Sequence, residues 1–351
     1  GSWADICITF AKVDGDKYTA FIIDKTCDGW VVGAEEKKMG IKGSSTCTFY
    51  FEDCKVPISN VIGKVGEGGP IAFNVLYAGR YKLGATTAAG CKFTIEAAYD
   101  FAKERFQFSK SIIEFDMIKN KFAEMIVRTW ESDSLVYMTT GSIDEAISTY
   151  SKNDPDYNIH VQKIIEDHAI EASICKVVCS ESLAFIVDEA VQILGGAGFI
   201  EEYDMSCIYR DERINRIFEG TNEINRLIVG GYTLKKSILE ELPIRDLVSS
   251  IPDSWCVEIE LDDNLPKIEA NVVEFSRIAI AYILNECIKE YGQDLKNEQW
   301  IIEPLSNCII SLCIMDTVFK RFKNISIDIK KKFKFRNLFK IIKCLPERNY
   351  F

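Results

Sequence analysis

The sequence is poor in the residues on which metal sites and Ser-His-Asp hydrolases depend. Its 351 residues include only two histidines, His160 and His168, and no metal-like cluster of ligands accompanies them. No G-x-S-x-G nucleophile elbow is present. We therefore expect neither a metal site nor a serine nucleophile.

The cysteines also lack the patterns that would assign them a role. There are thirteen, none forms a C-x-x-C pair, and the odd count argues against a disulfide framework. This usage predicts reduced thiols, as in a cytosolic or mitochondrial-matrix protein. The N-terminus, GSWADICITF, lacks the basic region of a signal peptide, and without an initiator Met it is consistent with a fragment.

Long hydrophobic runs and an excess of basic charge are missing as well. No run of 18 apolar residues exists, so no membrane span is expected. The net charge of −11 argues against nucleic acid as a partner. A hydrophobic content of 47% and a charged content of 27% are typical of a soluble globular protein with a sizeable core.

The order of patterns predicts an α+β fold. Residues 4–57 alternate polar and apolar positions in short runs that end at Pro57, which indicates antiparallel strands. Beyond a Gly-rich linker, four segments with apolar residues at three- and four-residue spacing predict an antiparallel four-helix bundle. A helical extension follows. The expected domains are 1–65 (partial β domain), 66–237 (helical bundle) and 238–351 (extension).

The end of the extension is basic in an otherwise acidic chain. Residues 320–351 hold eleven Lys or Arg against Asp328 and Glu347, with Phe and Ile interleaved. Such a segment is suited to an anionic membrane surface. A solvated helix face or a disordered basic tail explains it equally well.

One carboxylate stands out in the stretch RIFEGTNEINRLI. Glu219 lies between Phe218 and Gly220, just before Thr221 or Asn222, either of which can cap the helix that follows. The ordinary interpretation is a solvated glutamate at a helix entry. The functional one is a partly desolvated base for proton abstraction.

Two further motifs carry ligand-binding alternatives. QILGGAGF, from Gln192 to Phe199, ends a helix in glycines, which serve either as a C-cap or as bare backbone for a flat or phosphorylated ligand. In ERFQFSKSIIEF, Arg105 and Gln107 suit either a helix C-terminus or a phosphate or ribose contact.

Taken together, the motifs resemble the C-terminal half of an acyl-CoA dehydrogenase. The resemblance rests on DERINRIFEGTNEINRLIV, DEAVQILGGAGF, KERFQFSKSIIEFDMIKNKFAEM and EEKKMGIKGSSTCTFYFEDCKVPISNVIGKVGEGG, in the family's order. It runs from residue 1 to about residue 237. Within the family, the chain resembles the very-long-chain acyl-CoA dehydrogenases and their relative that assembles respiratory complex I. This resemblance rests on the position of Glu219 in FEGTNEI and on the C-terminal extension.

The resemblance implies a role for individual residues. Glu219 matches the base that removes the α-proton of an acyl-CoA, and its backbone N–H matches a donor to the thioester oxygen. The residues that match contacts to the substrate are Tyr77, Arg80 and Gly220. Those that match contacts to FAD, several of them from a neighbouring subunit, are Arg105, Phe106, Gln107, Phe115, Asp116, Gln192, Ile193, Leu194, Gly195, Gly196, Thr221, Asn222 and Glu223.

Three of these positions depart from the family's pattern, and so does the beginning of the chain. Glu223 stands where many members have Gln or Asp. Tyr77 stands where Asp or Asn is usual, and Asp116 stands where Gln is common. The family's N-terminal helical domain and its WITNG-like flavin strand have no counterpart in these 351 residues. The resemblance therefore implies that residues 1–351 alone retain FAD weakly or not at all.

The implied activity is the dehydrogenation of long or very-long-chain acyl-CoA to trans-2-enoyl-CoA in mitochondrial fatty-acid β-oxidation. It would use FAD in a homodimer, with electron-transfer flavoprotein as the acceptor, in the mitochondrial matrix or at the inner membrane surface. The alternative is a catalytically impaired scaffold, such as a relative of a complex I assembly factor, or a non-functional fragment.

Overall fold

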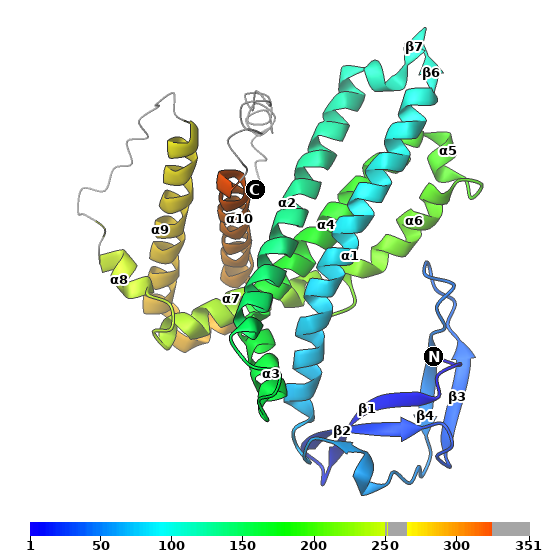
Figure 1. Cartoon of the computed structure of the whole chain (residues 1–351), viewed down its shortest axis with the longest axis vertical. Coiled ribbons are helices and arrows are strands. Elements are labelled where there is room, and N and C mark those ends of the chain that lie inside the picture. The colour runs from blue at the N-terminus through cyan, green and yellow to red at the C-terminus, as the bar shows by residue number, and fades with distance from the viewer. Residues whose placement is uncertain (250, 252–264, 325–351) are drawn as a thin grey trace.

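The protein opens with an antiparallel β region that leads directly into long helices (Figure 1). The computed structural model describes residues 1–249, 251 and 265–324. β1 pairs with β2 and β2 with β5, while β3 and β4 form a second, two-stranded sheet. The strands are β1 (Ile6–Val13), β2 (Lys17–Asp24), β3 (Trp30–Glu35), β4 (Cys47–Phe51) and β5 (Val61–Ile62), with a short 3-10 turn η1 (Ile58–Asn60). The prediction of antiparallel strands is confirmed.

The first sheet fixes the start of the longest helix. Thr19 and Ala20 of β2 are buried, and the Thr19 hydroxyl accepts a hydrogen bond from the Gly66 backbone at 3.0 Å. A Cβ on Gly68 would lie 2.8 Å from the Thr19 backbone, so only glycine permits this close approach of helix and strand. The Gly-rich linker thus seats the helix on the sheet.

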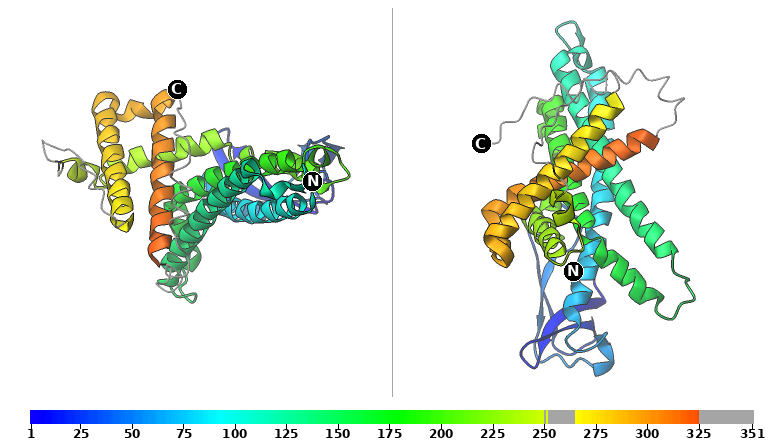
Figure 2. Two further views of the ribbon diagram at one scale, coloured as in Figure 1. Left: turned by 90° about the horizontal axis from the view of Figure 1, so that it is seen from above. Right: turned by 90° about the vertical axis from the view of Figure 1, so that its left-hand side faces the viewer.

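The helical region is built around three long helices. α1 and α2 run antiparallel and are joined by the small hairpin β6 (Phe106–Gln107) and β7 (Lys110–Ser111); α4 packs against both (Figures 1 and 2). The helices are α1 (Gly68–Glu104), α2 (Asp116–Ser148), α3 (Tyr157–Asp167), α4 (Ala169–Leu194), α5 (Gly196–Phe199), α6 (Asp204–Glu212) and α7 (Asn222–Ile238), with 3-10 turns η2 (Ile112–Glu114) and η3 (Arg213–Arg216). The expected α+β fold class is confirmed.

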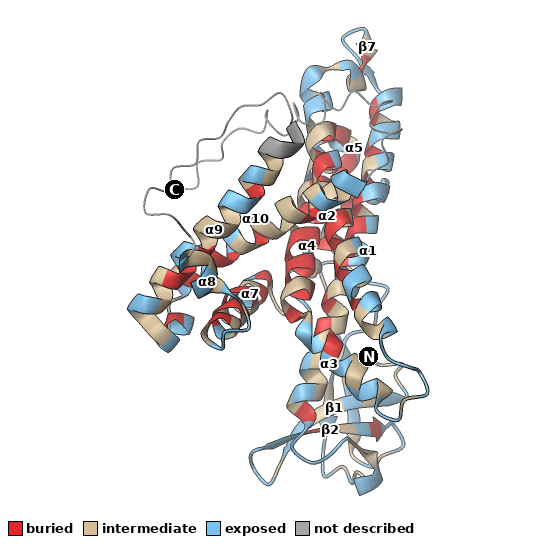
Figure 3. Ribbon diagram, turned by 60° about the vertical axis from the view of Figure 1, so that its left-hand side comes forward, coloured by how far each residue is buried: buried red, intermediate tan, exposed pale blue. Residues whose placement is uncertain are grey.

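The core of the helical region centres on α4. Its residues are apolar on nearly every face, as expected for a helix covered on all sides. Figure 3 shows it as the most continuously buried element, enclosed by its neighbours. The polar side chains that α4 buries, Lys176 above all, are therefore desolvated and need hydrogen-bond partners.

The C-terminal extension belongs to the same packed body. It comprises α8 (Ile244–Ser249), α9 (Leu265–Tyr291), the turn η4 (Gly292–Asn297) and α10 (Gln299–Asn324). Ile310 of α10 shares a core cluster with Leu135, Ile174 and Val229 of the bundle. The domain boundaries remain a prediction, but no gap in packing separates the extension from the bundle.

α10 is long and apolar enough to cross a membrane by length and composition alone. Its buried positions include Ile302, Leu305 and Ile310, which follow a three- to five-residue spacing along one side. That spacing is typical of a helix packed on a protein surface. Of the predicted basic segment 320–351, residues 320–324 end α10, and residues 325–351 lie outside the described residues.

The structure corrects one expectation about the cysteines. Cys27 and Cys54 are joined by a disulfide whose Cα atoms lie 6.3 Å apart. The prediction of reduced thiols is wrong for this pair, because the turns after β2 and β4 meet although 27 residues separate them. The other nine cysteines in the described ranges are free thiols.

Candidate functional site

The loop between η3 and α7 has an unusual backbone. Glu219 adopts φ of +57° and Gly220 adopts φ of +80°, two consecutive residues in the left-handed region. A non-glycine residue there costs about 1–2 kcal/mol, so the surrounding structure must hold it. The half-buried Glu219 is thus a fixed feature of the fold and not part of a freely moving loop.

Three side chains from three helices hold this loop by its carbonyl groups. Arg80 of α1 donates through Nε to the Glu219 oxygen at 3.0 Å. Lys176 of α4 and Asn225 of α7 both donate to the Gly220 oxygen, each at 2.8 Å. In the described part of the chain, no residue accepts a hydrogen bond from the Glu219 backbone N–H, which leaves this donor for a ligand.

Arg80 is almost completely buried behind the loop. Burial lowers the pKa of its guanidinium, and its Nη1 has no hydrogen-bond partner among the described residues. Buried donors are nearly always paired, so the unpaired Nη1 beside Glu219 is an exception among the described residues. This position agrees with the expected substrate contact, which stays a prediction.

Tyr77 faces away from the loop, toward α7. Its hydroxyl lies 2.7 Å from the hydroxyl of Tyr232, and Arg80 lies over its ring at 5.3 Å. Burial, together with the hydrogen bond to Tyr232, raises the pKa of Tyr77 well above its usual range. The expected contact between Tyr77 and the substrate is not tested, but its hydroxyl already has a partner in the protein.

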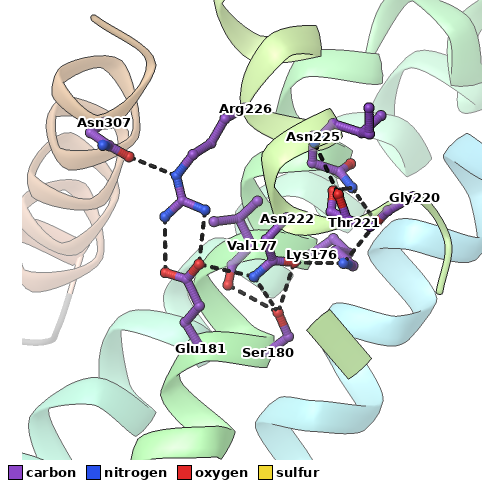
Figure 4. Close-up of polar contacts among 11 residues, drawn as sticks. Lys176, Val177, Ser180, Glu181, Gly220, Thr221, Asn222, Asn225, Arg226 and Asn307 are labelled. Carbon is purple, nitrogen blue, oxygen red and sulfur yellow. Dashed lines mark hydrogen bonds and ion pairs between the residues drawn. The ribbon is translucent and has the colours of Figure 1, made fainter. Parts of the chain in front are cut away.

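A continuous polar network supports the loop from behind (Figure 4). The Lys176 amine, fully buried, donates to Asn222 Oδ1 at 2.5 Å as well as to Gly220. The Asn222 amide donates to Glu181 at 2.9 Å, and Arg226 binds both oxygens of Glu181 at 2.8 and 3.0 Å. Arg226 Nε then donates to Asn307 of α10 at 2.7 Å. The extension is thereby linked to the loop.

The predicted cofactor residues that follow Glu219 occupy different environments. Thr221 caps α7 by accepting a hydrogen bond from the Ile224 backbone at 3.3 Å. Glu223 is exposed in the first turn, where its own backbone N–H and Thr221 lower the pKa of its carboxyl. Asn222 turns its side chain into α4, so a contact with a cofactor would have to use its backbone. These assignments stay predictions.

The remaining predicted cofactor residues lie at the opposite end of the bundle. Arg105 is 25 residues beyond Arg80 along α1, which is roughly 38 Å at 1.5 Å per residue. One cofactor in one chain cannot contact both ends at close range. This separation agrees with the expectation that these residues serve a neighbouring subunit. The group consists of Arg105, Phe106, Gln107, Phe115, Asp116, Gln192, Ile193, Leu194, Gly195 and Gly196.

Within that distant group, the side chains divide into exposed and buried sets. Arg105, Phe106 and Gln107 are exposed on the hairpin. Gly195 has a φ of +59°, and neither it nor Gly196 has any atom within 4 Å of an added Cβ. Ile193 and Leu194 are part of the core, so they can offer a ligand their backbone alone.

Sequence patterns did not reveal the residues that hold the loop of Glu219 and Gly220. Lys176, Glu181 and Asn225 carry no motif of their own. The one available signal is Lys176 itself, a charged residue within the apolar run SICKVVCS. A lysine in such a run requires buried acceptors, but the sequence does not say which ones.

Comparison with known proteins gives a consistent family match. Residues 66–232 match the family model described as "Acyl-CoA dehydrogenase, C-terminal domain". A probable acyl-CoA dehydrogenase of Bacillus subtilis is 39% identical over 322 residues, which cover 91% of this chain and 54% of that protein. The very long-chain specific acyl-CoA dehydrogenase of mouse mitochondria is 38% identical over 238 residues, covering 65% and 34%.

Solved structures show the same likeness. The crystal structure of an acyl-CoA dehydrogenase complexed with FAD from Bacillus anthracis has a TM-score of 0.86 at 38% identity, over 97% of this chain and 60% of that one. Butyryl-CoA dehydrogenase from Megasphaera elsdenii has a TM-score of 0.58 at 34% identity, over 67% and 57%. The chain spans about half the length of the Bacillus subtilis relative and about a third of the mouse protein.

Proposed function

Because the chain belongs to the acyl-CoA dehydrogenase family, we propose that it carries the catalytic base of an FAD-dependent acyl-CoA dehydrogenase. The observation that supports this most is the left-handed loop at Glu219, whose carbonyl is held by the buried guanidinium of Arg80. An ordinary solvated glutamate at a helix entry would not need three buried donors to fix its backbone.

The residues present fit FAD as far as the chain extends. At one end lie Thr221 and the N-terminus of α7, and at the other lie the open backbone of Gly195 and Gly196 and the exposed Arg105. The helix N-terminus and the guanidinium favour anionic and oxygen-rich groups. We propose a homodimer in which the distant end of one copy reaches the loop of the other, because the two groups of predicted cofactor residues lie at opposite ends of the bundle in one chain.

Glu219 removes the α-proton of the acyl thioester, and its fixed backbone keeps the carboxylate in one place for that step. Its backbone N–H donates to the thioester oxygen, on which negative charge develops. Arg80 and Lys176 place buried positive charge behind the same loop. FAD, when bound, supplies the acceptor for the hydride that leaves the β-carbon.

We propose long or very-long-chain acyl-CoA as the substrate class, with electron-transfer flavoprotein as the acceptor. This choice is supported by the mouse very long-chain relative and by FEGTNEI in the base loop. The scaffold alternative is supported by Tyr77, whose hydroxyl bonds to Tyr232 at the expected place of a substrate contact.

Flavin bleaching tests these proposals. Palmitoyl-CoA should bleach the flavin absorbance of the FAD-loaded protein and yield the 2-enoyl product, and butanoyl-CoA should do so far more slowly. Stoichiometric FAD without bleaching by any acyl-CoA would favour the scaffold. For residues 1–351 alone, we predict weak or no FAD retention, and a one-to-one flavin content after gel filtration would contradict that prediction.

For location, we propose the mitochondrial matrix, at the inner membrane surface, with residues 320–351 contacting anionic lipid. The support is the mitochondrial relatives and the basic, Phe- and Ile-rich composition of this segment. Deleting residues 325–351 leaves α10 intact and should abolish co-sedimentation with cardiolipin liposomes. Equal pelleting of both forms would contradict the membrane contact.

A further inference from the structure

A glycine in α1 lies directly beneath the carboxylate of Glu219. If Gly79 carried a Cβ, that atom would be 2.7 Å from Cδ and 2.8 Å from Oε1 of Glu219, and closer still to Oε2. All three terminal atoms of the base therefore occupy the space that a side chain at position 79 would take.

Gly79 differs in this respect from the other glycines inside α1. A Cβ on Gly84 or Gly90 would meet Cys175 or Leu183 of α4, at 3.2 and 3.3 Å, which is helix-to-helix packing. For Gly79, by contrast, the three atoms nearest to an added Cβ all belong to Glu219. Glycine weakens a helix interior, and at position 79 the missing side chain makes room for Glu219.

The backbone of Glu219 cannot move to make room. Arg80, the residue next to Gly79 on the same helix, holds the Glu219 carbonyl, while Lys176 and Asn225 hold the Gly220 carbonyl. A methyl group at position 79 would therefore displace the carboxylate alone, by rotation about its side-chain bonds. Reaching ordinary contact distance requires a retreat of roughly 1 Å.

We propose that Gly79 is a positioning residue, whose missing side chain is the space that places the Glu219 carboxylate for α-proton removal. Gly79 touches the base and not the substrate, so it acts through Glu219. The proposal rests on the proposed function, because it assigns Gly79 to that same reaction.

The test compares Gly79→Ala with Gly141→Ala, both assayed with added FAD because residues 1–351 alone are expected to retain it weakly. Both sites lie inside long helices, and Gly141 of α2 has no atom within 4 Å of an added Cβ. Alanine favours the helix at both positions, so Tm should stay the same or rise in both variants. Gly141→Ala should keep the wild-type kcat for palmitoyl-CoA.

Gly79→Ala should lower kcat by about 100-fold, because a misplacement of about 1 Å at a reacting group has an effect of that order. KM and flavin content should change little, which separates misplacement of the base from loss of binding. In a Glu219→Gln background, adding Gly79→Ala should have no further effect, since the carboxylate it displaces is gone.

Two results would overturn the assignment while leaving the proposed function intact. One is a kcat of Gly79→Ala within twofold of Gly141→Ala when Glu219→Gln is inactive. The other is a fall in Tm of several degrees in Gly79→Ala alone, which would assign the space to packing. A Glu219→Gln variant with normal kcat would instead refute the proposed function itself.

Discussion

Lys176 is a buried residue that holds the loop of Glu219 and Gly220, and its replacement tests how that loop is stabilised. Its amine is completely enclosed and bonds to the carbonyl of Gly220 and the side chain of Asn222. Burial, with a smaller contribution from the charge of Arg80, lowers the pKa of Lys176 from 10.5 to about 8. The protein therefore holds a charged lysine at neutral pH at a cost in folding free energy.

The sign of the pH dependence follows from the direction of this shift. Between pH 8 and pH 10.5 the unfolded chain keeps the proton that the folded protein releases, so stability rises with pH across this window. The stability that Lys176 contributes as a neutral amine is fully present above pH 10.5, its pKa in the unfolded chain. It is lost as pH falls through about 8, its pKa in the folded protein. The difference between the two pKa values corresponds to about 3 kcal/mol.

Lys176→Met removes this pH dependence. At pH 7 the variant avoids the cost of a buried charge, but it loses one hydrogen bond from a charged donor to each of the Gly220 carbonyl and the Asn222 oxygen, worth about 1.5–3 kcal/mol each. Asn225 and Ser180 still donate to these two acceptors. The two effects nearly cancel at pH 7. At pH 10 the wild-type protein should be more stable than the variant by about 3 kcal/mol.

Guanidinium unfolding of both proteins at pH 7, 8, 9 and 10 measures this difference directly. Other titrating groups affect both proteins alike and cancel in the comparison. Parallel stability curves for the wild-type protein and Lys176→Met would refute the account of a lysine buried with its charge.

Three other substitutions test neighbouring contacts. Thr221→Ala removes the cap of α7 and should lower the free energy of unfolding by about 1 kcal/mol, measured by urea unfolding, whereas Thr221→Ser should not. Arg226→Lys loses the two-point contact with Glu181, which is 41% exposed, so thermal melts should show a loss of at most about 1 kcal/mol, while kcat falls because the loop is less firmly held. Arg321→Ala removes a guanidinium 3.8 Å above the Trp130 ring and should loosen α10, seen as faster hydrogen exchange there while α4 is unchanged.

The sequence predicted the elements whose signals are local. Alternating runs located β1 to β4, and apolar spacing located α1, α2 and α7. The break at His168 between α3 and α4 was missed, because EDHAIEAS contains neither Gly nor Pro and continues the helical pattern. The short helices α5 and α6 were missed because each is too brief to show a period.

In the candidate site, too, only residues with a local sequence signal could be predicted. Glu219 was predicted because its motif is continuous in sequence. The groups that hold it were not found, because Arg80 donates across 139 residues and Lys176 across 44. The sequence predicted that Arg80 contacts the substrate. Only the structure showed that its Nε donates to the Glu219 carbonyl. Such pairings depend on which faces of α1 and α4 meet, and no short motif specifies that.

The most direct test of the central claim is the rate at which palmitoyl-CoA reduces the flavin in a single turnover of Glu219→Gln. Glutamine keeps the size of the side chain and cannot take a proton. The account predicts a fall of about 10²–10⁴-fold with FAD content and acyl-CoA binding unchanged. A rate within threefold of wild type would show that Glu219 is not the base.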